Sequence, residues 1–98
     1  MNENRMRRAT FFSLSMVLAA VSVDRLAFAE SSEKAAAEAL FQTGRELAAN
    51  GDLADACSKF EASQRLDPAL GTLLHLADCY EREGLTASAW ATFGEAAS

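Results

Sequence analysis

The sequence predicts an all-α protein built from repeated helix-turn-helix units. Half of the 98 residues are hydrophobic and only one is proline, a composition typical of a folded helical domain. No stretch long enough to form a β-strand alternates apolar and polar residues, which is the pattern of a half-buried strand. The same pattern of apolar and small residues occurs twice, 33 residues apart. A repeat of this length is typical of stacked two-helix units. The copies pair Leu40, Gly44, Leu47, Gly51, Ala56 and Phe60 with Leu73, Ala77, Tyr80, Gly84, Ala89 and Phe93.

The first 29 residues have the layout of a secretory signal peptide. Three arginines among the first eight residues give a basic start, residues 9–23 form an uncharged apolar run, and Ala27-Phe28-Ala29 supplies an A-x-A cleavage pattern. A membrane span needs roughly 20 apolar residues, more than this run provides. We therefore expect a Sec-type signal cleaved after Ala29 and a periplasmic or secreted product. The alternative is an inner-membrane protein anchored by its uncleaved signal.

The charge of the expected mature region, residues 30–98, limits its partners. This region holds twelve acidic and five basic side chains, a net charge of −7. Such a surface repels nucleic acid and anionic lipid, so we expect neither nucleic-acid binding nor membrane contact after signal cleavage. The charge favours solubility and a preference for basic partners.

Helix formers and stop signals divide the mature region into four expected helices. Ser31 or Ser32 is expected to cap the first helix and Asp52 the second. Glycine in the left-handed conformation is expected to end the first and third helices. Pro68 stops the second, because the residue before proline disfavours helical geometry. The expected ranges are about 33–50, 53–67, 71–83 and 86–98, and their short connections make neighbouring helices antiparallel.

This pattern resembles the tetratricopeptide repeat, a helix-turn-helix unit of about 34 residues. Gly44 and Ala77 match the small residue at the close helix crossing, Phe60 and Phe93 match the aromatic residue between units, and Pro68 matches the closing proline. Two departures are Thr43 and Ser63, where the family prefers Leu and Ala. The resemblance covers two units, about 37–69 and 70–98, within a domain of residues 30–98. The resemblance implies a fragment of an α-solenoid. The chain is also similar to exported bacterial proteins that contain such repeats.

The resemblance also implies a peptide-binding groove lined by the first helix of each unit. Carried over residue by residue, the groove consists of Glu38, Phe41, Arg45, Leu74, Asp78 and Glu81. A second expected surface is formed by Trp90 and Phe93, because the last helix of a stack leaves one face open. The alternative is that Phe41 and Leu74 are ordinary packing residues and the charged side chains only solvate their helices.

Cys57 and Cys79 are expected to form a disulfide. They lie on the second and third helices at similar heights on either side of the turn at Pro68, and exported proteins permit such bonds. The alternative is two free buried thiols that behave as small hydrophobes. Zinc binding by His75, Cys57 and Cys79 has no recognised ligand spacing to support it, so we expect no metal site.

The expected function is that of an exported protein–protein interaction module or scaffold with no cofactor and no enzymatic activity. The sequence holds no C-x-x-C pair, no glycine-rich phosphate loop and no nucleophile elbow. The expected partner is a protein or peptide of unknown identity. Two alternatives stay open: a fragment of a longer protein without independent activity, and a module that homodimerises through its last helix.

Overall fold

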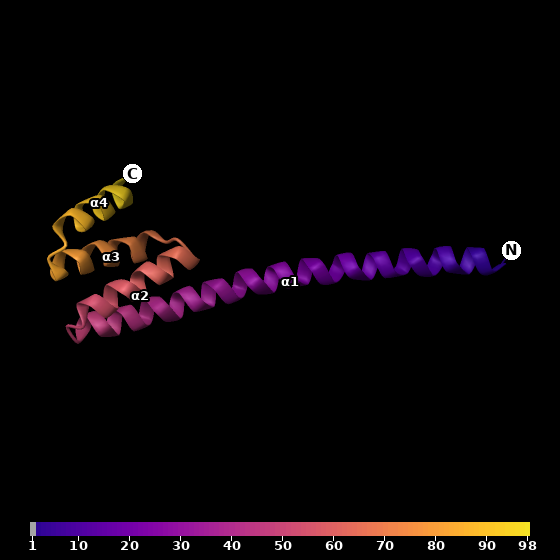
Figure 1. The fold of residues 1–98 in the computed structure, drawn as a ribbon, viewed down its shortest axis with the longest axis horizontal. Helices are drawn as coiled ribbons and strands as arrows, with labels where there is room; N and C mark the ends of the chain where they lie inside the picture. The colour runs from indigo at the N-terminus through magenta and orange to yellow at the C-terminus, as the bar shows by residue number, and fades with distance from the viewer. Residues whose placement is uncertain (1) are drawn as a thin grey trace. The chain divides into compact units, whose positions relative to one another are not determined.

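The protein is all-α. A computed structural model describes the backbone of residues 2–98 and the side chains of residues 25–98. It contains α1 (Asn2–Ala49), α2 (Leu53–Leu66), α3 (Leu70–Glu83) and α4 (Thr86–Ala97), and no strand within that range (Figure 1). The chain divides into two compact units, residues 1–32 and 33–98, and the second unit holds the helical hairpins.

The expected signal peptide lies mostly outside the residues whose side chains are described. This applies to its basic start and to the whole of its apolar run, residues 9–23. Of the helices in the described part of the chain, none is long and apolar enough to span a membrane.

The expected start of the first helix is wrong. Ser31 and Ser32 lie inside α1 and cap nothing, because the helix already begins at Asn2. A serine cap operates only where the preceding chain leaves the helical conformation. The residues before Ser31 include no proline or glycine, the two residue types that most disfavour a helix, so nothing interrupts it there.

The two hairpins turn in the same way, at positions 33 residues apart. Gly51 and Gly84 have φ angles of 85° and 84°, in the left-handed region that favours glycine. After each glycine, the next amide reaches back to the preceding helix: Asp52 N donates to Leu47 O at 2.9 Å and Leu85 N donates to Tyr80 O at 2.8 Å. These are the bonds of a Schellman turn, and they confirm the predicted helix ends.

The second helix begins where it was expected, but the Asp52 side chain does not cap it. Asp52 occupies the N-cap position and makes no side-chain capping bond. Its ψ angle of 67° departs from the extended backbone that usually carries a capping side chain. The backbone carbonyl of Asp52 instead accepts the first intrahelical bond, from Ala56 N at 2.9 Å.

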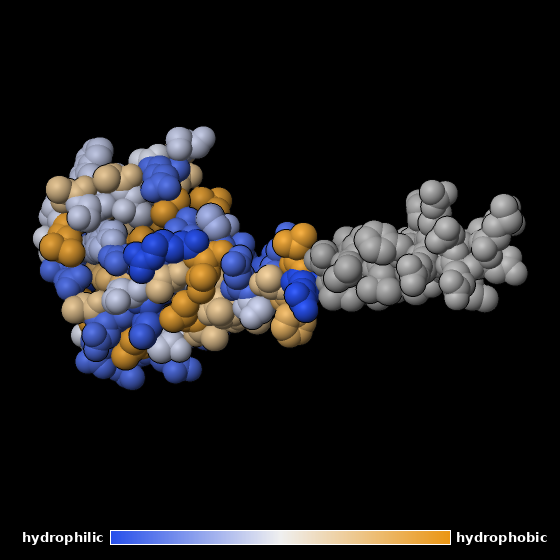
Figure 2. Space-filling model, turned by 45° about the vertical axis from the view of Figure 1, so that its right-hand side comes forward, coloured by the Kyte–Doolittle hydropathy of each residue, from blue (hydrophilic) through white to orange (hydrophobic). Residues whose placement is uncertain are grey.

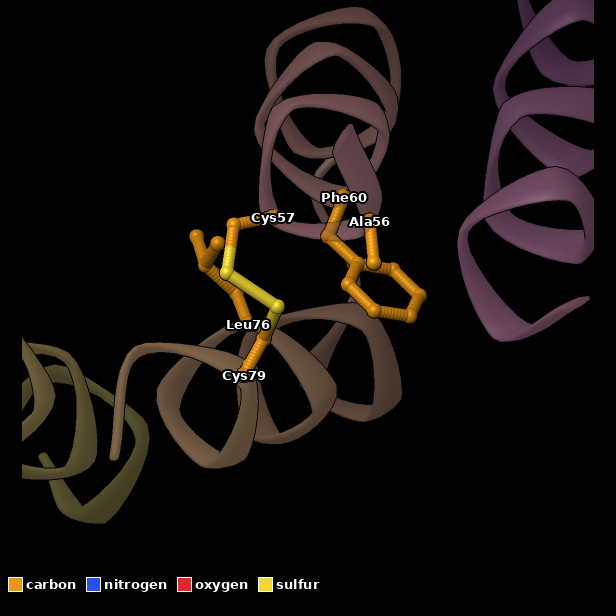
Figure 3. Close-up of a cluster of buried hydrophobic side chains, with 5 residues drawn as sticks. All are labelled: Ala56, Cys57, Phe60, Leu76 and Cys79. Carbon is orange, nitrogen blue, oxygen red and sulfur yellow. A yellow bond between two sulfur atoms is a disulfide. The ribbon is translucent and has the colours of Figure 1, made fainter. Parts of the chain in front are cut away.

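The core lies between the first hairpin and α3. Its buried cluster consists of Ala56, Cys57, Phe60, Leu76 and Cys79 (Figure 3). Phe60, on α2, is 1% exposed and is the largest fully buried side chain. The partly buried Phe41 and Leu47 of α1 pack against this cluster, so that side chains from three helices share one core.

Gly44 sets the separation between α1 and α2. A Cβ atom built on Gly44 would lie 2.8 Å from a ring carbon of Phe60, closer than real side chains approach. The predicted close crossing at Gly44 is therefore confirmed, and the atom it must avoid belongs to Phe60. Nearby, Ser63 Oγ donates to the carbonyl of Ala37 at 2.7 Å, which gives the expected departure at Ser63 a structural role between the same two helices.

Candidate partner-binding surfaces

A groove of about 250 Å³ lies between the end of α1 and the length of α3. It is lined by Arg45, Ala48, Ala49, Phe60, His75, Asp78, Cys79 and Arg82. Of the residues predicted for the peptide groove, it contains Arg45 on the first helix of one hairpin and Asp78 on the first helix of the other. The walls of this groove thus carry side chains of both charges.

The aromatic side chains near this groove form one cluster. The ring centroid of His75 lies 5.0 Å from that of Phe41, in an edge-to-face arrangement, and 5.5 Å from that of Phe60, in a stacked one. Phe41 and Phe60 are 5.8 Å apart. The guanidinium of Arg45 lies 6.0 Å from the Phe41 centroid, at the outer limit of a cation–π contact. Phe41 therefore packs at the edge of the core and stays partly buried.

Arg82 lines the groove and contacts the end of α1. Its guanidinium donates to the backbone carbonyl of Ala48 at 3.1 Å. The last carbonyls of a helix have no intrahelical partner and carry partial negative charge, so a cation there is favourable. Sequence reasoning missed Arg82 and also missed the aromatic role of His75, because both contacts depend on how α3 packs against α1.

The remaining predicted groove residues are not among those that line it. Glu38 is exposed on α1, and Leu74 on α3 is 44% exposed. Glu81 lines a different hollow, between α3 and α4. The structure therefore brings Arg45 and Asp78 together in the groove and distributes the others over the neighbouring surface.

The second hollow, of about 310 Å³, is apolar and lies between α3 and α4. Its lining consists of Glu81, Thr86, Ala89, Trp90 and Phe93. The side chain of Trp90 is 78% exposed and that of Phe93 is 40% exposed. Figure 2 shows that the visible face of residues 33–98 mixes hydrophobic and hydrophilic side chains. The Trp90–Phe93 surface, defined by these five lining residues, is the second candidate site.

A disulfide and a hydrogen bond connect α2 to α3. Cys57 and Cys79 are bonded in the structure, with Cα atoms 5.6 Å apart, and both residues are buried (Figure 3). The Tyr80 hydroxyl donates to a Glu61 carboxylate oxygen at 2.5 Å. Burial, followed by this bond and the nearby carboxylates, raises the pKa of Tyr80 to about 12.

Neither the groove nor the hollow offers a metal site. Cys79 is committed to the disulfide and so is not available as a thiolate beside His75. Among the residues with described side chains, no three potential metal ligands converge. The two surfaces present aromatic, charged and apolar side chains.

Comparisons with known proteins add no relative. No protein-family model matches the chain, and neither the curated proteins nor the solved structures contain a significant match.

Proposed function

We propose that the chain is an exported protein–protein interaction module or scaffold, built from two tetratricopeptide-like hairpins. The observation that carries the proposal is the groove between the first helices of the two hairpins, with Arg45 on one wall and Asp78 on the other. Helix pairs that stack on each other leave such surfaces for a peptide or protein segment to bind.

The groove suits a peptide more than a small substrate. It is open and lined by aromatic and charged side chains, including the stacked pair Phe60 and His75. A peptide side chain can pack against the exposed His75 ring while its charged or backbone groups pair with Arg45 and Asp78. The resulting contact combines an apolar centre with a polar rim, as protein interfaces do.

Export is the second part of the proposal. The basic start, apolar run and A-x-A pattern favour a signal peptide, and the Cys57–Cys79 bond fits an oxidising compartment. Expression in a bacterial host followed by intact-mass measurement tests this part. We expect the exported product to begin at Glu30. A product that keeps residues 1–29 and sediments with membranes would instead favour the uncleaved anchor.

Peptide selection against the purified full-length chain tests the groove. We expect selected peptides to bind about tenfold more weakly to Arg45→Glu and to Asp78→Arg. The matched control is Lys34→Glu, which makes the same change of charge on an exposed position of α1, roughly 16 Å away along the helix. Equal binding to all four proteins would show that the groove is not the recognition site.

A further inference from the structure

We propose that the Trp90–Phe93 surface is the docking site for an amphipathic helix of a partner protein, one with lysine or arginine beside its apolar stripe. This inference rests on the proposed interaction function and names a partner class for its second surface. It follows from three features: the repeat register, the charges around the hollow, and the poor fit of a second copy of the chain.

The repeat register shows that a helix belongs on this surface. Trp90 and Phe93 stand 33 positions after Cys57 and Phe60. In the first hairpin those two positions are 3% and 1% exposed, because α3 covers them: Cys57 is bonded to Cys79, and Phe60 stacks on His75. In the second hairpin the same positions are 78% and 40% exposed. Within the residues whose side chains are described, the surface on which one helix already packs is therefore repeated with no helix over it.

The composition of α4 agrees with burial under a further helix. Its sequence, TASAWATFGEAA, contains one charged residue, Glu95. Exposed helices usually carry a charged face, whereas a helix that is apolar or small almost all round is typical of a buried element. The hollow beside Trp90 gives an apolar side chain of the incoming helix a place to insert.

Charge selects a basic partner. Residues 67–98 carry five carboxylates and a single arginine, and of these charged residues only Glu81 lines the hollow. That arginine, Arg82, donates to the carbonyl of Ala48 and lines the other groove, so it does not neutralise this surface. Glu81 lines the hollow itself. A lysine or arginine next to the apolar stripe of the partner helix would pair with Glu81 at the rim.

A second copy of the chain fits this surface poorly. In a tail-to-tail dimer, the Glu81 side chains of the two copies would meet at the contact, and the residues that line the hollow include no basic side chain. In a head-to-tail contact, the first helix of the next copy would have to play the part of α3. The α3 residues buried in the shared core include Leu76 and Cys79, and the residues 33 positions earlier are Thr43 and Glu46, both polar and exposed.

The test uses the fluorescence of Trp90, the only tryptophan in the chain. The probe is a synthetic 18-residue helical peptide with leucines at positions i, i+3, i+4 and i+7 and lysines beside them. We expect it to shift Trp90 emission of the full-length chain to shorter wavelength, as burial of the indole requires. A peptide of the same composition with its leucines spread round the helix, and one with glutamate for lysine, should each bind about tenfold more weakly.

Calorimetric titration of the lysine peptide locates the site. Trp90→Ala, at a position exposed enough to leave the fold intact, should weaken binding about tenfold. Leu74→Ala, which removes an exposed apolar side chain from α3 outside this hollow, should leave it unchanged. No emission shift with the peptide, equal binding by Trp90→Ala, or an emission shift that depends only on protein concentration, as dimerisation would give, would each overturn the inference.

Groove variants separate this inference from the proposed function. Arg45→Glu should not alter binding of the lysine peptide, while it should weaken the peptides selected on the groove. Loss of only the lysine-peptide response would reject the docking site and leave the groove intact. Loss of only the groove response would do the reverse.

Discussion

Phe60 and Phe93 occupy the same place in successive hairpins, and only Phe60 is buried. Phe60 lies against Gly44 of α1 and stacks on His75 of α3, and it is 1% exposed. Phe93 borders an open hollow and is 40% exposed. The comparison shows that burial in this protein depends on the next helix along the stack, as expected where each unit packs only on its neighbours. It also divides the molecule into a closed junction, formed by α1, α2 and α3, and an open one at α4.

Replacing the two phenylalanines gives the largest contrast. Phe60→Ala should cost about 3–5 kcal/mol in free energy of unfolding, since it empties a packed core site. Phe93→Ala should cost less than about 1 kcal/mol, because much of its side chain already contacts water. Urea unfolding followed by circular dichroism measures both. Similar losses for the two variants would remove the distinction between the closed and open junctions.

The disulfide is a covalent connection found only at the closed junction. The residue that corresponds to Cys57 in the second hairpin is Trp90. Replacing both cysteines by alanine should lower the free energy of unfolding by about 3 kcal/mol, because the bond closes a loop of 22 residues in the unfolded chain. Unfolding of the native and doubly substituted proteins, with reductant added to the native one as a control, measures this. An unchanged unfolding midpoint on reduction would contradict it.

Two helical glycines provide a matched pair of substitutions. Gly44→Ala places a Cβ 2.8 Å from the Phe60 ring and should destabilise the protein by about 1–3 kcal/mol. Gly94→Ala meets nothing within 4 Å and should stabilise α4 by roughly 0.5–1 kcal/mol, the usual difference in helix propensity. The predicted signs are opposite, and thermal unfolding reads them directly. Stabilisation by Gly44→Ala would mean that α1 and α2 are not in close contact.

Titration of Tyr80 probes the closed junction with the smallest perturbation. Tyr80 is the only tyrosine, so ultraviolet absorbance reports its ionisation alone. We expect a Tyr80 pKa of about 12 in the folded protein. We expect a lower pKa in the Glu61→Gln variant, because it lacks the carboxylate that accepts the hydrogen bond from the Tyr80 hydroxyl. The folded pKa is raised above the model-peptide value of roughly 10. The stabilisation that the neutral Tyr80 side chain contributes is therefore fully present below about pH 10 and is lost as pH rises from about 10 to 12. A titration near 10 in the native protein would show that Tyr80 is neither partly buried nor hydrogen-bonded to Glu61.

The sequence was sufficient for the all-α class and for most helix ends, because these depend on local residue types. Gly51 and Gly84 end their helices as predicted. The start of α1 was not predictable from Ser31 and Ser32, since a cap is only one option for a serine within a favourable helical segment. The local sequence pattern also could not show that the Asp52 side chain makes no capping hydrogen bond.

The candidate sites were predictable only in part. Arg45 and Asp78 line the groove because both lie on the first helices of their hairpins, a relation that the repeat encodes. His75 and Arg82 join the groove through contacts with α1 that depend on the packing angle between helices, which a single sequence does not encode. The separation of Glu81 from the other predicted groove residues has the same origin.

The central claim is that the second hairpin packs on the first through Phe60. Nuclear Overhauser contacts from the Phe60 ring protons test this most directly. We predict contacts with the Gly44 α protons on α1 and with the His75 ring on α3 in the same sample. A Phe60 ring that shows contacts only within α2 would contradict the account, since the two hairpins would then not share a core.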